Sequence, residues 1–264
     1  MSPALGLLEA FDVARGSIVS LAGGGGKTTL MYALAAAATA RGWRVITTTT
    51  TRIYPPAPDE SPTLVLLDAH ADAPDVLRRQ LVARGHVTVA QRALADGKLG
   101  GVAPGVVDSW AAGGVADAIV VEADGGAGRP LKAARDGEPV FPACSTDCVL
   151  VVGADALGAP LDERWVFRSA LAAEIAAIPL GAPVTPGVVA DLLLGPRGLA
   201  RAAPPRSRVW VFINKAESSE RRAAADAAAR WLVARAKGRL AGVVVGSLRH
   251  PAHGFIRSAV GPSS

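Results

Sequence analysis

The chain has 264 residues, of which 50% are apolar and 19% are charged, and its formal net charge is +5. This length suits one large α/β domain, and because no stretch of about eighteen residues is free of polar or helix-breaking residues, we expect no membrane span. The positive charge is spread along the chain, which disfavours a nucleic-acid partner, and the N-terminus lacks a signal-peptide pattern, which predicts a cytoplasmic protein.

A glycine-rich turn near the N-terminus carries the first chemical signal. A short apolar strand over 18–21 runs into four glycines, a lysine and two threonines, and an Ala-rich helix follows over 27–41. Glycines at a strand-to-helix turn let the backbone adopt positive φ, so successive N–H groups and the helix N-terminus can point at one anion. The turn therefore predicts a phosphate-binding loop (P-loop) made of Gly23, Gly24, Gly25, Gly26, Lys27, Thr28 and Thr29.

Two side chains of the P-loop have specific expected roles. Lys27 would reach the β- and γ-phosphates of a nucleoside triphosphate and support catalysis, and the Thr28 hydroxyl would hold Mg²⁺. The spacing departs from the common motif G-x-x-x-x-G-K-[ST], whose first glycine would fall on Leu21. The shortened form resembles the P-loops of the MinD, ParA and dethiobiotin synthetase class of NTPases. Many of those have a lysine where this chain has Ala22, so their lysine-dependent dimer mechanism is not expected here, although a homodimer stays open.

A threonine-rich strand over 43–50 follows, and it ends in Thr50, Thr51 and Arg52. Threonines favour strands, which by itself explains those inside the strand. In a parallel sheet, however, the end of this strand lies at the same edge as the P-loop. Thr50 and Arg52 are therefore predicted to contact the γ-phosphate or a second substrate.

The next segments alternate between strands and helices. Strands are expected over 63–68 and 86–90, and helices over 73–84 and 106–112, with a loop over 97–105. This alternation predicts a mostly parallel sheet with helices on both faces. The fold class is thus a Rossmann-like α/β P-loop NTPase, with residues 1–264 forming a single nucleotide-binding domain.

A second chemical landmark lies at 117–126, where four apolar residues lead into Glu122 and Asp124 beside two glycines. The segment resembles a Walker B strand. An acid at that edge would bind Mg²⁺ across from Thr28, directly or through water. Residues two apart on a strand share a face, so either acid could be the metal ligand and the other could position water. A strand that simply ends in a solvated turn is the alternative.

Basic residues and cysteines follow this strand. Arg129 and Lys132 are candidates for binding an anionic substrate or nucleotide, and they could equally be surface charges. Cys144 and Cys148 have no histidine nearby, so we expect packing thiols rather than a zinc site.

The last third of the chain adds helices over 163–177 and 186–194, the second N-capped by Thr185. An apolar strand over 208–213 ends in Asn214, Lys215, Ala216 and Glu217. This segment resembles the Asn-Lys-x-Asp motif with which GTPases read guanine, with glutamate in place of aspartate. Asn214, Lys215 and Glu217 are therefore predicted to meet the base. Adenine-binding relatives also place asparagine here, so ATP and GTP both stay open.

Several segments in this order resemble the YqeC-type family of selenium-dependent hydroxylase accessory proteins, also described as selenium cofactor biosynthesis proteins. They are Ala-Gly-Gly-Gly-Gly-Lys-Thr-Thr-Leu, Thr-Thr-Thr-Thr-Arg-Ile, Val-Glu-Ala-Asp-Gly, Arg-Pro-Leu-Lys-Ala, Gly-Ala-Asp-Ala-Leu-Gly-Ala-Pro-Leu and Ile-Asn-Lys-Ala-Glu. The resemblance implies a role in the maturation of selenium-dependent molybdenum hydroxylases. The implied partners are such a hydroxylase or its cofactor-assembly proteins.

Two classes of function fit these motifs. The first is an enzyme, either an NTP hydrolase or a kinase-like phosphotransferase that acts on a small substrate. The second is a nucleotide-gated binding or delivery protein with little turnover. Arg129 and Lys132 lining one pocket with the P-loop would favour the enzyme, whereas a large exposed apolar patch would favour the delivery protein.

Overall fold

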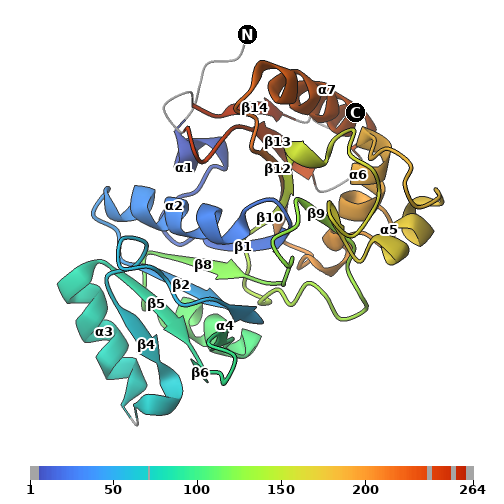
Figure 1. Cartoon of the computed structure of the whole chain (residues 1–264). Coiled ribbons are helices and arrows are strands. Elements are labelled where there is room, and N and C mark those ends of the chain that lie inside the picture. The colour runs from blue at the N-terminus through green and yellow to red at the C-terminus, as the bar shows by residue number, and fades with distance from the viewer. Residues whose placement is uncertain (1–5, 71, 237–239, 251–253, 260–264) are drawn as a thin grey trace.

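Strand β1 (Ile18–Gly23) lies inside a nine-stranded sheet in the computed structural model, which describes residues 6–70, 72–236, 240–250 and 254–259 (Figure 1). The strand order is β14-β13-β12-β10-β1-β8-β2-β5-β4. All neighbours pair in parallel except β14, which is antiparallel to β13. The other strands of this sheet are β2 (Val45–Thr49), β4 (Leu64–Leu66), β5 (His86–Ala90), β8 (Ala118–Glu122), β10 (Asp147–Gly153), β12 (Arg208–Asn214), β13 (Leu240–Val245) and β14 (Ile256–Ala259).

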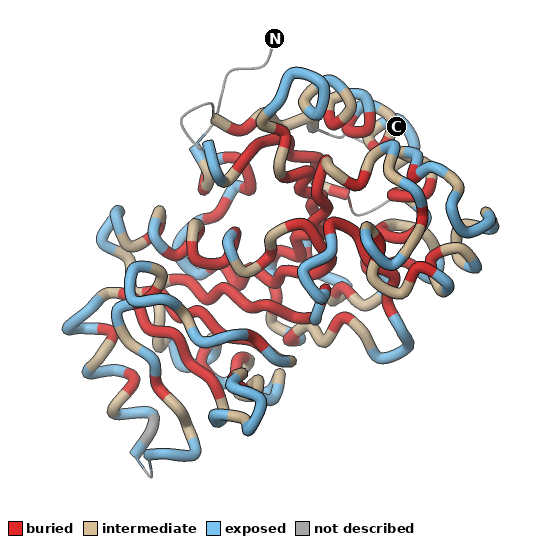
Figure 2. The backbone as a smooth tube through the Cα atoms, viewed as in Figure 1, coloured by how far each residue is buried: buried red, intermediate tan, exposed pale blue. Residues whose placement is uncertain are grey.

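Helices cover both faces of the sheet, and its central strands β1, β2, β8 and β10 are accordingly buried on both faces. Alternate residues Val19 and Leu21 of β1 pack in one core cluster with α1 (Leu7–Ala10) and α2 (Lys27–Thr39). The opposite face packs against α3 to α7. Figure 2 shows the buried positions running along these strands. The remaining helices are α3 (Ala73–Arg84), α4 (Pro104–Ala112), α5 (Ser169–Ala176), α6 (Pro186–Leu194) and α7 (Ser219–Arg235).

The predicted mostly parallel α/β sheet with helices on both faces is therefore confirmed. The expected cap of α6 is also present, because the Thr185 hydroxyl accepts a hydrogen bond from the Val188 N–H at 3.3 Å. The helix expected over 163–177 is shorter, since residues 166–167 form a strand and α5 begins at Ser169. No helix in the described parts of the chain is long and apolar enough to cross a bilayer.

Two small sheets lie outside the main one. The first has the order β3-β7-β6 and is antiparallel. Its strands are β3 (Arg52–Ile53), β6 (Arg92–Ala93) and β7 (Leu99–Gly100), and it follows the carboxyl ends of β2 and β5 in the chain. The second pairs β9 (Leu131–Lys132) with β11 (Val166–Phe167) in parallel. Both sheets were missed as strands from the sequence, because two-residue strands have no detectable period.

Phe212 joins the two ends of the chain to the sheet. Its buried ring lies 5.6 Å from the Phe11 ring and 6.0 Å from the Phe255 ring, measured between centroids. We predict that Phe212→Ala lowers the free energy of unfolding by about 3–5 kcal/mol, because the cavity left behind loses these contacts. Urea unfolding of the wild-type and variant proteins measures this change in the free energy of unfolding. The exposed Val82 provides a control, since Val82→Ala should stay within about 0.5 kcal/mol of wild type; equal effects of both substitutions would contradict this packing.

Candidate functional site

The glycine turn between β1 and α2 has the backbone geometry of an anion-binding loop. Gly23, Gly25 and Gly26 all have positive φ, and a Cβ on Gly25 would collide with the backbone nitrogen of Gly153. Only glycine therefore fits that position without a backbone shift. The Gly24 and Gly25 N–H groups donate to the carbonyls of Val151 and Arg129, each at 2.9 Å. These bonds fix the loop against two neighbouring segments.

The amino end of α2 provides the free donors of this loop. The first N–H groups of a helix have no partner within the helix, and no side chain caps this end, where Gly26 is the N-cap residue. The positive end of the helix dipole adds to their attraction for an anion. The amides that an anion could reach are thus those of residues 26–29, whereas the amides of Gly24 and Gly25 hold the loop in shape.

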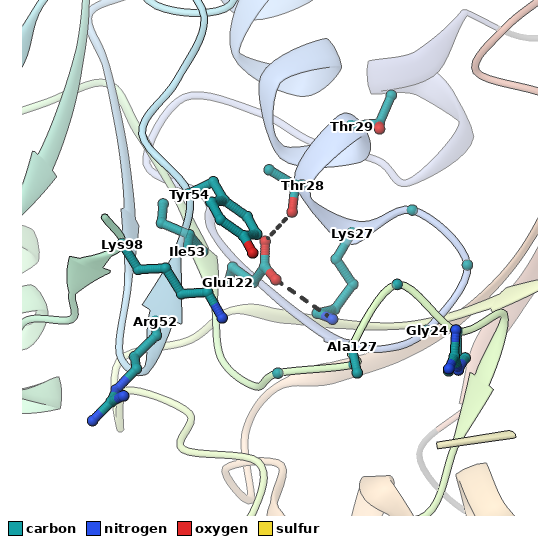
Figure 3. Close-up of a pocket in the computed structure, with 16 residues that line it drawn as sticks. Gly24, Lys27, Thr28, Thr29, Arg52, Ile53, Tyr54, Lys98, Glu122 and Ala127 are labelled. Carbon is teal, nitrogen blue, oxygen red and sulfur yellow. Dashed lines mark hydrogen bonds and ion pairs between the residues drawn. The ribbon is translucent and has the colours of Figure 1, made fainter. Parts of the chain in front are cut away.

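This helix end opens into a cavity of about 620 Å³ (Figure 3). Binding pockets for small ligands typically measure about 300–1,000 Å³. Arg52 and Arg129, two of the predicted contact residues, lie on its wall. Its lining residues are Gly24, Gly25, Gly26, Lys27, Thr28, Thr29, Arg52, Ile53, Tyr54, Lys98, Glu122, Gly125, Gly126, Ala127, Gly128 and Arg129.

Lys27 lies at the inner end of the cavity with only 5% of its surface exposed. Its Nζ donates to the Gly23 carbonyl at 2.8 Å and lies 3.5 Å from Glu122 Oε1 and 3.3 Å from Asp124 Oδ1. Burial by itself favours the neutral amine, but the two carboxylates outweigh it and raise the pKa of Lys27 above its ordinary value. The lysine is therefore a fixed positive charge beside the loop.

Glu122 and Thr28 face one another across the cavity wall. The Thr28 hydroxyl donates to Glu122 Oε2 at 2.7 Å, and burial raises the pKa of the Glu122 carboxyl despite the opposing attraction of Lys27. These two oxygen groups suit Mg²⁺, which is usually held by one or two carboxylates together with phosphate oxygens and water. A metal held by protein side chains alone is not indicated, since the described residues contain no cluster of three or more His, Cys, Asp and Glu.

Asp124 differs from Glu122 although both approach Lys27. It is fully buried and does not line the cavity. Its two oxygens accept from the Gly23 N–H at 3.1 and 3.0 Å, and Oδ2 lies 2.9 Å from Lys132 Nζ. Asp124 therefore holds the start of the P-loop and the lysine, while Glu122 is the acid that a ligand in the cavity would meet.

Lys132 belongs to the interior rather than to the cavity wall. It is fully buried, and its Nζ donates to the Gly125 carbonyl at 2.8 Å and to Glu138 Oε2 at 3.1 Å. Glu138 in turn forms a bidentate pair with Arg168, at 2.7 and 2.9 Å. Burial opposes this charge, but Arg168 and Lys132 lower the pKa of Glu138 to about 2.

We call these six residues the charge network: Lys27, Glu122, Asp124, Lys132, Glu138 and Arg168. Sequence reasoning found the first four but missed Glu138 and Arg168. No local pattern marks them, because Arg168 lies thirty residues beyond its partner Glu138 and their contact depends on the tertiary fold.

Thr50 is placed beside the cavity but not on its wall. Its hydroxyl donates to the Val140 carbonyl at 2.7 Å, and the neighbouring Thr49 hydroxyl donates to the Glu122 carbonyl at 2.8 Å. Thr49 therefore joins the end of β2 to the end of β8, and Thr50 joins it to the segment that contains Val140. Arg52, in contrast, lines the cavity, with its side chain 67% exposed.

The Asn214 to Glu217 segment begins at the end of β12 and meets the P-loop on the side away from Glu122. Asn214 Nδ2 donates to the Gly25 carbonyl at 2.8 Å, and its Oδ1 accepts from the Leu248 N–H at 3.1 Å. Lys215 pairs with Asp155 at 2.8 Å. Glu217 Oε1 lies 3.4 Å from an Arg221 nitrogen, whereas its buried Oε2 has no hydrogen-bond partner among the described residues. None of these residues lines the 620 Å³ cavity.

Two comparisons with known proteins bear on this site. A family model described as YqeC protein matches residues 19–170. That range includes the P-loop and the whole charge network, but not Asn214 to Glu217. A curated relative, the uncharacterized protein YqeC of Escherichia coli (strain K12), is 32% identical to this chain over 126 residues. The match covers 47% of this chain and 49% of the relative, so it spans about half the length of each.

Lys132 provides a test of the charge network. We predict that Lys132→Met lowers the free energy of unfolding by about 3–5 kcal/mol, because it leaves the buried Asp124 carboxylate without its closest cation. Arg197→Met is the matched control, since its partner Glu174 and Arg197 itself are both more than half exposed and such pairs contribute less than about 1 kcal/mol. Chemical denaturation measures both. A Lys132→Met protein as stable as wild type would contradict the network's role.

Proposed function

This chain belongs to the YqeC family, and we propose that it is a Mg²⁺-dependent nucleoside triphosphatase. Its role would be that of an accessory factor in the maturation of selenium-dependent molybdenum hydroxylases. The family resemblance supports the biological role, and the site supports the chemistry.

The observation that carries the proposal is the uncapped amino end of α2, which opens into the cavity beside Lys27. Backbone N–H groups and a helix dipole attract an anion. A buried ammonium group strengthens that attraction, because low surrounding polarity increases the energy of each charge contact. A polyphosphate chain fits this arrangement, since it offers several negative oxygens to successive donors.

Thr28 and Glu122 would hold Mg²⁺, which neutralises phosphate charge when bound. The bond from the Thr28 hydroxyl to Glu122 places both oxygen groups at one point of the cavity wall. Asp124 would act as a positioning residue, because it contacts Lys27 and the Gly23 N–H but not the cavity. Lys27 would stabilise the charge that develops on the phosphates during transfer to water.

The base would lie toward Asn214, on the side of the P-loop where Glu217 is found. The buried Glu217 Oε2 has no hydrogen-bond donor among the described residues. A carboxylate oxygen accepts from guanine N1–H and N2–H, so this acceptor supports GTP. ATP remains the alternative, because Glu217 is one methylene longer than the aspartate of the GTPase motif.

An enzyme is favoured over a delivery protein by the cavity wall. Arg129 lines the cavity together with the P-loop, which is the arrangement expected for a substrate site, although Lys132 does not. The large apolar side chains that are exposed in the described parts of the chain are Tyr54, Leu64, Val82 and Leu180, and they come from different elements. They give no support for an apolar docking surface.

Lys27→Ala tests the proposed turnover. We predict a loss of about 10³-fold in the rate of phosphate release from the preferred triphosphate, because the substitution removes the charge that stabilises the transferring phosphoryl group. Arg41→Ala is the control. It removes an equal charge from the opposite end of α2, where Arg41 pairs with Glu9 at the surface. A Lys27→Ala protein that folds and hydrolyses at the wild-type rate would overturn the proposal.

Calorimetric titration with ATP and GTP, with and without Mg²⁺, tests the base. We predict tighter binding of GTP in the presence of Mg²⁺ and a loss of about tenfold or more for GTP in Glu217→Gln, because a charged acceptor is replaced by a neutral one. The ATP affinity of Glu217→Gln should change less. Tighter binding of ATP by the wild-type protein would refute the guanine assignment while leaving the triphosphatase proposal standing.

A further inference from the structure

The cavity has a second wall that the proposed nucleotide does not use. It is formed by Arg52 of β3, by Tyr54 directly after β3, and by Lys98 just before β7. Arg52 thus lies in the small β3-β7-β6 sheet, and Lys98 directly precedes one of its strands. Figure 3 shows Lys98 reaching from this side toward Glu122 and Lys27, whereas the Arg52 side chain extends away from them. We call Arg52, Tyr54 and Lys98 the outer wall.

The outer wall is positively charged and weakly neutralised. Arg52 has an acidic neighbour in Asp96, at 3.8 Å, and both side chains are about half exposed or more. Lys98 Nζ lies over the Tyr54 ring, 5.0 Å from its centroid, which is a cation–π contact rather than an ion pair. Glu122 is the one acid among the residues that line the cavity, and in the proposed function it serves Mg²⁺. The two cations of the outer wall therefore favour a further anion.

Tyr54 adds an aromatic surface to these charges. Its side chain lines the cavity, and the residue is 68% exposed. An exposed ring beside a cation suits a ligand that joins a flat ring to an anionic group, because the rings stack while the anion meets the cation. Two cations match a phosphate monoester, which carries up to two negative charges, better than a single carboxylate.

We infer that the outer wall binds a second small molecule, a phosphate monoester attached to a planar ring, next to the terminal phosphate of the nucleotide. The inference rests on the proposed function, because the nucleotide is assigned to the opposite wall. The nucleotide's own base does not account for Tyr54. The predicted base contacts, Asn214 and Glu217, lie outside this cavity on the far side of the P-loop.

Phenyl phosphate is a suitable probe for this site. The protein is first saturated with Mg²⁺ and the imidodiphosphate analogue of GTP or ATP, whichever binds tighter, and phenyl phosphate is then titrated calorimetrically. Wild type should bind the probe, and Lys98→Ala should weaken it by about tenfold or more, through loss of a charge-assisted contact. Tyr54→Ala should weaken phenyl phosphate about two- to tenfold without changing orthophosphate binding, and Tyr54→Phe should retain it.

Arg92→Ala is the matched control. Arg92 is an exposed cation on the same small sheet, in β6, but it does not line the cavity. It should leave phenyl phosphate binding unchanged. Equal weakening in Arg92→Ala and Lys98→Ala would overturn the inference, because the effect would then follow from net charge alone.

The analogue titration separates the two proposals. If wild type binds the analogue but not phenyl phosphate, the inference is wrong and the triphosphatase proposal stands. If Lys98→Ala or Tyr54→Ala weakens the analogue itself as much as the probe, the outer wall belongs to the nucleotide and the inference is again wrong. If wild type does not bind the analogue, the proposed function fails and the inference fails with it.

Discussion

The ammonium group of Lys27 is the charge on which the site depends. It lies within 3.5 Å of two carboxylates and donates to the Gly23 carbonyl. A buried charge is tolerated only with close partners of opposite sign. Asp124 is therefore balanced by Lys132, Lys132 by Glu138, and Glu138 by Arg168. The shape of the glycine turn is in this way tied to a segment more than a hundred residues further along the chain.

The order of the strands brings these groups together. Strand β1 pairs with β8 on one side and with β10 on the other, and parallel strands end at the same edge of a sheet. Glu122 at the end of β8 thus reaches Lys27, and the end of β10 accepts the Gly24 N–H. These contacts of the site therefore lie at the carboxyl edge of the sheet.

The sequence predicted those features of the fold and the site that depend on the order of neighbouring residues. The glycine turn, the acidic strand end and the alternation of strands and helices are local features, and the α/β sheet and the YqeC family were both confirmed. Burial of Lys132 and its pairing with Glu138 were not predictable, because a basic residue after a loop looks the same whether it faces water or the core. Spacing alone also could not separate Glu122 from Asp124. Nucleotide, Mg²⁺, the selenium role and a cytoplasmic location stay predictions.

The side-chain amide of Asn214 connects two parts of the molecule that are distant in the sequence. Asn214 holds the Gly25 carbonyl with its nitrogen and the Leu248 amide with its oxygen, so the P-loop and the chain after β13 are joined through a single short side chain. These two regions can separate only by breaking a hydrogen bond. A movement of either region must therefore be followed by the other, which couples the position of the glycine turn to the segment that follows β13.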